Sequence, residues 1–129
     1  MKGQPTHAVD YAELARAVGV KQVLEADAFD LEAVSEALKA ATETDEPSLV
    51  VVRGECILRI RDRWGPALVV DPDLCTACGM CLKLGCPAIS RTPEGKAVIE
   101  PALCVGEVCG ICAQVCPKNC ISVRKGGGE

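Results

Sequence analysis

Apolar and polar positions near the start of the chain follow a helical period. Residues 10–19 predict a short helix, because Asp10 and Glu13 resemble a capping box and Gly19 ends the pattern. The apolar face of this helix consists of Tyr11, Leu14, Ala15 and Val18. Residues 22–26 (QVLEA) then predict a short strand.

A second helix and strand follow. Asp30 can cap a helix whose apolar stripe is Leu31, Val34, Leu38 and Ala41. Residues 43–47 interrupt it, and the β-branched run SLVVVR (48–53) is typical of a parallel strand. Strand, helix and strand in this order form one βαβ unit. Two strands and two helices cannot cover both faces of a parallel sheet, so residues 1–64 should dock on a partner or complete a larger α/β domain.

The second half is an internal repeat. ALVVDPDLC (67–75) matches KAVIEPALC (96–104) after a shift of 29 residues, and CPAIS (86–90) matches CPKNCIS (116–122). Each copy predicts a strand, a cysteine loop, a short helix and a second strand. The copies meet at TPEGK (92–96), a turn that contains proline and glycine.

Each copy carries four cysteines and a Cys-Pro pair. The standard bacterial ferredoxin run is C-x2-C-x2-C-x3-C-P, in which the fourth cysteine ligates the other iron–sulfur cluster. The first copy reads C-x2-C-x2-C-x4-C-P and the second C-x4-C-x2-C-x3-C-P. Extra residues between ligands lengthen a surface loop at little cost, so both copies retain the ligand pattern. Gly79 and Gly110 lie where the loops must approach a cluster closely.

The crossed pattern predicts two four-iron–four-sulfur (4Fe-4S) clusters. Cluster 1 would be bound by Cys75, Cys78, Cys81 and Cys116. Cluster 2 would be bound by Cys86, Cys104, Cys109 and Cys112. The expected fold class is therefore α+β, with a partial α/β (βαβ) segment over residues 1–64 and a bacterial-type two-cluster ferredoxin domain over residues 65–129.

Composition supports a metal-stabilised domain. The chain has 129 residues, 10 cysteines and only 2% aromatic residues, so large rings cannot fill its core. It has no apolar run of membrane-spanning length and no secretory h-region, which predicts a cytoplasmic protein whose cysteines bind metal. The net charge is −4, and no basic patch suggests nucleic acid.

Two other uses of the cysteines stay open. Structural zinc sites could use eight cysteines, although zinc usually takes two ligand pairs across a longer loop. A disulfide framework is the other alternative. The remaining two cysteines, Cys56 and Cys120, are expected to pack as small apolar side chains, and Cys120 aligns with Ala88 of the first copy. The alternative for Cys120 is a substitute ligand in place of Cys116.

Both halves together resemble a known family. The segment VDYAELARAVGVKQVLEADAFDLEAVSEALKAATETDEPSLVVVRGECIL is similar to the end of a thiamine-diphosphate-binding domain, and CTACGMC, GCPAI and CGICAQVCP resemble a following ferredoxin domain. This order resembles the C-terminal part of the alpha subunit of indolepyruvate:ferredoxin oxidoreductase.

The resemblance implies an electron-transfer component. Single electrons would pass from a thiamine-bound 2-oxoacid intermediate through the two clusters to external ferredoxin. The family's thiamine site needs a Gly-Asp-Gly element, and this sequence has no Gly-Asp pair, so thiamine diphosphate and magnesium are expected only on a partner chain, a catalytic subunit. The alternative is a free-standing ferredoxin-type carrier with an adaptor segment.

Overall fold

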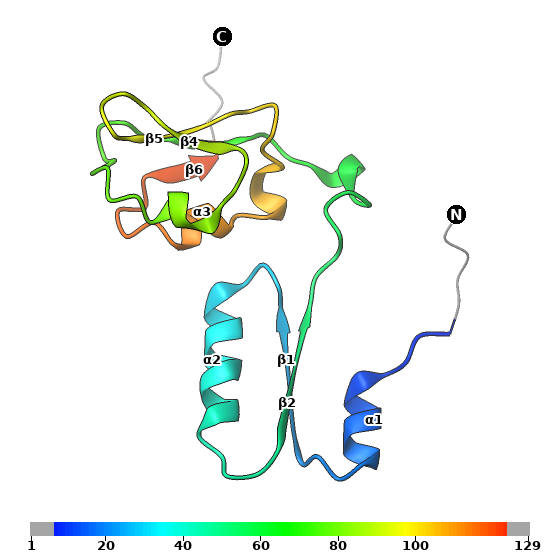
Figure 1. Cartoon of the computed structure of the whole chain (residues 1–129). Coiled ribbons are helices and arrows are strands. Elements are labelled where there is room, and N and C mark those ends of the chain that lie inside the picture. The colour runs from blue at the N-terminus through cyan, green and yellow to red at the C-terminus, as the bar shows by residue number, and fades with distance from the viewer. Residues whose placement is uncertain (1–6, 124–129) are drawn as a thin grey trace. The chain divides into compact units, whose positions relative to one another are not determined.

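The computed structural model (Figure 1) describes residues 7–123. The chain forms two compact units that divide between Gly54 and Glu55, whereas the sequence suggests a boundary after residue 64. Residues 55–64 carry their own contacts, including a 2.9 Å hydrogen bond from the Trp64 indole nitrogen to the Ile57 carbonyl oxygen. Helices and strands both occur, which confirms the α+β class. Within the described residues, no helix is long and apolar enough to cross a membrane.

Side-chain caps start both helices of the first unit. The carboxylate of Asp10 accepts a hydrogen bond from the Glu13 amide at 3.0 Å and starts α1 (Tyr11–Ala17). The carboxylate of Asp30 accepts one from the Ala33 amide at 3.0 Å and starts α2 (Leu31–Thr42). Each cap satisfies an amide that has no partner within its helix, as the sequence pattern predicts.

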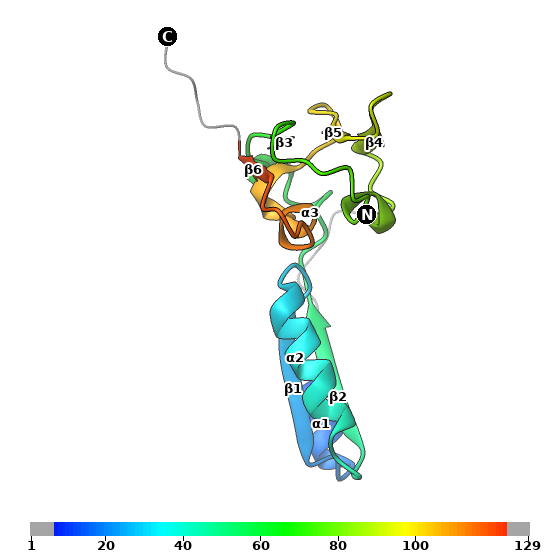
Figure 2. The same cartoon turned by 90° about the vertical axis from the view of Figure 1, so that its left-hand side faces the viewer.

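The two strands of the first unit are parallel. β1 (Gln22–Asp27) pairs with β2 (Ser48–Arg53) in a register that runs from Gln22 opposite Ser48 to Asp27 opposite Arg53. Helix α2 connects the strands, and Figures 1 and 2 show α1 and α2 on opposite faces of this two-stranded sheet. These elements match those predicted from the hydrophobic pattern.

The first unit leaves much apolar surface uncovered. On α1 the buried side chains are Ala12 and Ala15, whereas Tyr11, Leu14 and Val18 are 58%, 53% and 73% exposed. Of the predicted apolar face of this helix, only Ala15 is therefore buried within the unit. A sheet of two strands is too narrow to cover both the two alanines and the larger apolar side chains of α1. Strand β2 is likewise incompletely covered.

The second unit contains two antiparallel ribbons. Its strands are β3 (Leu68–Val70), β4 (Ile89–Arg91), β5 (Ala97–Ile99) and β6 (Ile121–Val123). Its short helices are η1 (Arg61–Arg63), η2 (Cys81–Leu84), η3 (Gly106–Val108) and α3 (Ile111–Gln114). β3 pairs with β6, and β4 pairs with β5. Each ribbon thus combines one strand from each sequence repeat, so the two repeats are interlocked.

The core of the second unit consists of small and medium side chains. Its main cluster of buried residues contains Leu68, Ala88, Ala97, Ile99 and Ile121, together with Cys81, Cys116 and Cys120. Among the described residues, no large side chain is fully buried. The hydrophobic contribution to the stability of this unit is therefore limited, because that contribution scales with the apolar area removed from water.

Candidate metal centres

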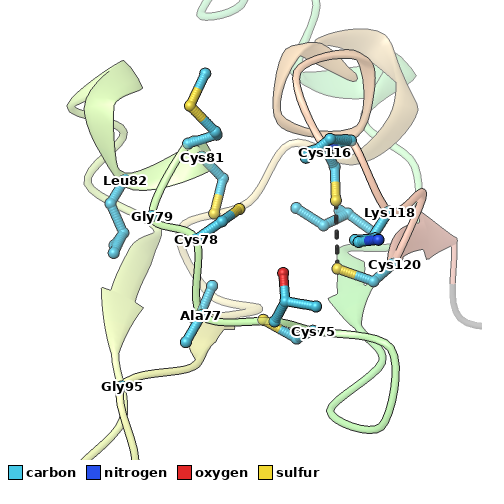
Figure 3. A pocket seen from close by; sticks show the side chains of 15 residues that line it. Cys75, Ala77, Cys78, Gly79, Cys81, Leu82, Gly95, Cys116, Lys118 and Cys120 are labelled. Carbon is cyan, nitrogen blue, oxygen red and sulfur yellow. Dashed lines mark hydrogen bonds between the residues drawn. The ribbon is translucent and has the colours of Figure 1, made fainter.

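One cavity of the second unit is lined by Cys75, Cys78, Cys81 and Cys116 (Figure 3). Cys75 and Cys78 lie on the loop that follows β3, and Cys81 begins η2. Cys116 follows α3 from the other repeat. This loop curls through Ala77 and Gly79, whose φ angles are 56° and 73°. The left-handed conformation at Gly79 is one that glycine adopts without steric cost.

A second cavity is lined by Cys86, Cys104, Cys109 and Cys112. Cys104, Cys109 and Cys112 follow β5, whereas Cys86 lies at the end of the first repeat's loop. The amide of Gly106 donates a 3.4 Å hydrogen bond to the sulfur of Cys104. Gly110 has a φ of 58° and starts α3, so it turns the chain between Cys109 and Cys112.

The electrostatics of the thiols reflect the same two sets. Burial raises the pKa of Cys81, and the nearby thiols of Cys116, Cys75 and Cys78 raise it further. Burial also raises the pKa of Cys112 to about 11, assisted by Cys104, Cys109 and Cys86. Neighbouring thiolates disfavour one another's negative charge, so each set is close enough to interact. Shared cationic iron would relieve this repulsion.

Hydrogen bonds lower the pKa of two other thiols, those of Cys116 and Cys75. Burial works to raise the pKa of Cys116, but hydrogen bonds from the backbone and side chain of Cys120, and from the amides of Lys118 and Asn119, lower the pKa overall. The pKa of Cys75 is lowered chiefly by backbone hydrogen bonds with Ala97 and Ala77. Such donors stabilise thiolate, the form of cysteine that binds metal.

The donor chemistry of both cavities fits iron–sulfur clusters. Clusters of the 4Fe-4S type take four cysteine thiolates, and hydrogen bonds to sulfur tune their potential. Each cavity combines three thiols from one repeat with the Cys-Pro cysteine of the other, and the first cavity is also lined by Cys120. Within residues 7–123, no three histidine, cysteine, aspartate or glutamate side chains are grouped so as to hold a single metal ion. The ligand roles themselves stay a prediction.

The two remaining cysteines differ from each other. Cys56 is exposed, so the expectation that it packs is wrong; it lies in a turn in which its carbonyl oxygen accepts a 2.8 Å hydrogen bond from the Arg59 amide. Cys120 is buried as expected, but its sulfur lies 3.3 Å from that of Cys116. Burial raises the pKa of Cys120 to about 12. Sequence reasoning missed the contact with Cys116.

Comparison with known proteins identifies relatives of both halves. Residues 1–52 match the C-terminal TPP-binding domain of thiamine pyrophosphate enzymes. The indolepyruvate oxidoreductase subunit IorA of Thermococcus kodakarensis is 37% identical over an alignment 137 positions long, gaps included, which covers 97% of this chain and 21% of that protein. The IorA subunit of Pyrococcus abyssi is 40% identical over an alignment 124 positions long, which covers 88% of this chain and 19% of that protein.

Part of the chain also matches a small ferredoxin. Ferredoxin-3 of Nostoc sp. is 32% identical over an alignment 78 positions long, which covers 44% of this chain and 78% of that protein. The chain spans about a fifth of the length of the IorA proteins, 21% and 19% in the two cases above. By this similarity over nearly its whole length, the chain is related to the C-terminal region of the indolepyruvate:ferredoxin oxidoreductase alpha subunit.

Proposed function

We propose that this chain is the electron-transfer component of a 2-oxoacid:ferredoxin oxidoreductase of the indolepyruvate type. It would relay single electrons from a thiamine-bound intermediate on a partner chain to ferredoxin through two 4Fe-4S clusters. The observation that carries the proposal is the sorting of the eight predicted ligand thiols into two cavities, each of which combines three of them from one repeat with one from the other. The IorA and ferredoxin relatives support the same function.

The chain's own residues would hold the clusters and set their environment. Cluster 1 would be bound by Cys75, Cys78, Cys81 and Cys116, and cluster 2 by Cys86, Cys104, Cys109 and Cys112. Such clusters exchange single electrons when bound. The amides around Cys116 stabilise its thiolate, and the partly buried Cys112 would help to shield cluster 2 from water. Hydrogen bonding and burial of this kind determine reduction potential.

The first unit would dock this relay on the catalytic subunit. Tyr11, Leu14 and Val18 give α1 an exposed apolar stripe, and a two-stranded sheet needs further cover to be stable. Residues 1–52 are related to a thiamine-enzyme domain, yet the sequence has no Gly-Asp pair for magnesium and diphosphate. Thiamine diphosphate and magnesium are therefore proposed to lie on the partner chain.

Metal analysis of the anaerobically purified chain tests the cluster content. We expect about eight irons and about eight sulfides per chain, with two interacting spins in electron paramagnetic resonance (EPR) after dithionite reduction. The exposed Cys56 provides a control, because Cys56→Ser should leave iron content unchanged. Zinc in place of iron would overturn the proposal.

A double variant tests the crossed ligand sets. Cys86 and Cys112 line the same cavity, so Cys86→Ala/Cys112→Ala should lose cluster 2 alone and retain about four irons. Uncrossed ligation would place these residues on different clusters, and the double variant would then lose both. Cys78→Ala/Cys112→Ala is the matched control, because it removes a ligand from each set and should lose nearly all iron.

A turnover experiment separates the subunit from a free-standing ferredoxin-type carrier, an alternative favoured by the similarity to Ferredoxin-3. We expect the chain to copurify with a thiamine-bearing subunit, and its clusters to be reduced by indolepyruvate and coenzyme A only in that complex. Ferredoxin should then reoxidise them. A stable monomer that exchanges electrons with unrelated enzymes, and binds no such subunit, would favour the carrier.

A further inference from the structure

The cavity of cluster 1 is lined by a fifth thiol, that of Cys120. Its side chain is only 5% exposed, and its sulfur lies 3.3 Å from the sulfur of Cys116. Figure 3 shows the two sulfurs facing each other, with Cys75 on the same side of the cavity. Cys120 also interacts with Cys75 through a side-chain hydrogen bond. One thiol thus contacts two of the four proposed ligands.

The turn between Cys116 and Cys120 produces this contact. The amide of Asn119 donates a 3.1 Å hydrogen bond to the Cys116 carbonyl oxygen, and Asn119 has a φ of 49°. A left-handed asparagine reverses the chain locally, which returns Cys120 to the sulfur of Cys116. The first repeat lacks the two extra residues of this turn and has Ala88 where the second has Cys120.

The backbone of Cys120 is held independently of Cys116. Its carbonyl oxygen accepts a 2.7 Å hydrogen bond from the Asp71 amide, and the next residue, Ile121, pairs with Val70 in the β3–β6 ribbon. Replacement of Cys116 removes none of these backbone bonds. The Cys120 thiol would therefore remain at the cavity when the Cys116 sulfur is absent.

We propose that Cys120 is a reserve ligand for cluster 1 that replaces Cys116 when the sulfur of Cys116 is lost. The inference rests on the proposed function, because it requires a cluster in this cavity. Cys120 would bind iron as thiolate and release its proton to solvent. No electron moves, so the exchange is a ligand substitution. Cluster 2 has no such reserve, because Ala88 occupies the equivalent position.

Iron content of alanine variants, purified anaerobically as the full chain, tests the inference. Cys116→Ala and Cys120→Ala should each retain about eight irons, whereas the double variant should retain about four, with cluster 2 intact. Cys86→Ala is the matched control from the other repeat and should fall to about four irons. Cys116→Ala with no more iron than the double variant would overturn the reserve role. If the wild-type chain itself lacks iron, the proposed function fails instead.

A spectroscopic variant provides the second readout if the double alanine variant does not fold. In Cys116→Ala/Cys120→Ser, a serine oxygen would replace the reserve sulfur, so the EPR g values of reduced cluster 1 should differ from those of Cys116→Ala. Cys120→Ser alone should leave these g values close to wild type. Identical spectra of Cys116→Ala with and without Cys120→Ser would show that Cys120 does not bind iron.

Discussion

The backbone of Gly106 lies directly against the backbone of Pro66. A β-carbon on Gly106 would come within 2.5 Å of the Pro66 carbonyl oxygen and 2.9 Å of the Gly65 carbonyl oxygen. Gly106 also has a φ of 75°, a conformation that residues with side chains adopt at a cost. It lies between Cys104 and Cys109, where the second motif is longer than the standard run. The longer loop therefore packs against the segment that leads into β3.

Substitution of Gly106 should destabilise the second unit. We expect Gly106→Ala to lower the free energy of unfolding by more than about 2 kcal/mol, because the strained φ and the clash with backbone act together. The measurement is urea unfolding of the anaerobic protein, followed by circular dichroism. Gly65→Ala is the control, since a β-carbon on Gly65 would meet no atom within 4 Å. Equal unfolding midpoints for both variants would contradict this account.

Much of the second unit could be predicted because short motifs and their spacing along the sequence specify it. The shift of 29 residues between repeats gives the order of the strands, and the cysteine spacing indicates which thiols share a loop. The structure places Cys116 with the first loop and Cys86 with the second. Pairing of β3 with β6, and of β4 with β5, brings the end of each repeat to the start of the other.

The unpredicted features depend on contacts between distant segments or on turn geometry. Helical periodicity gave α1 an apolar stripe, but it could not show that Ala12 and Ala15 face the sheet while Tyr11 is exposed. The contact of Cys120 with Cys116 depends on the left-handed Asn119. Its signal in the sequence was the spacing from Cys-Pro to Ile-Ser, which is two residues longer in the second repeat.

Adjacent residues of β5 should respond differently to truncation. Ile99 is 7% exposed and Val98 is 43% exposed, because alternate side chains of a strand point to opposite faces. We expect Ile99→Ala to cost about 2–5 kcal/mol of unfolding free energy. Val98→Ala should cost less than about 1 kcal/mol. Anaerobic urea unfolding of both variants checks the difference, and equal losses would be inconsistent with a core at Ile99.

The helix cap at Asp30 should stabilise α2 through its acceptor oxygen. Asp30→Ala removes the bond to the Ala33 amide and should cost about 1 kcal/mol, within the usual range for such caps. Asp30→Asn keeps an acceptor oxygen and should lie close to wild type. Hydrogen exchange of the α2 amides measures the local effect. If Asp30→Asn exchanges as fast as Asp30→Ala, the stabilisation comes from charge rather than from the hydrogen bond.

Removal of iron should unfold the second unit and spare the first. The second unit has only small and medium apolar side chains in its core, so the proposed iron–thiolate bonds would supply much of its stability. After anaerobic chelation under reducing conditions, amides of β3, β4, β5 and β6 should exchange at least about 100-fold faster. Amides of β1 and β2 should change little, because no proposed iron ligand lies in that unit.

The comparison between units makes this experiment decisive about what holds the second unit together. The control is a sample that has been treated with the chelator but has kept its iron. Hydrogen exchange of the β1 and β2 amides reports any general effect of the reagents. Uniform acceleration in both units would indicate that they unfold together. If the ribbons kept their protection after complete iron loss, residues such as Leu68 and Ile121 would suffice for folding, and the thiol sets would serve electron transfer without supporting the fold.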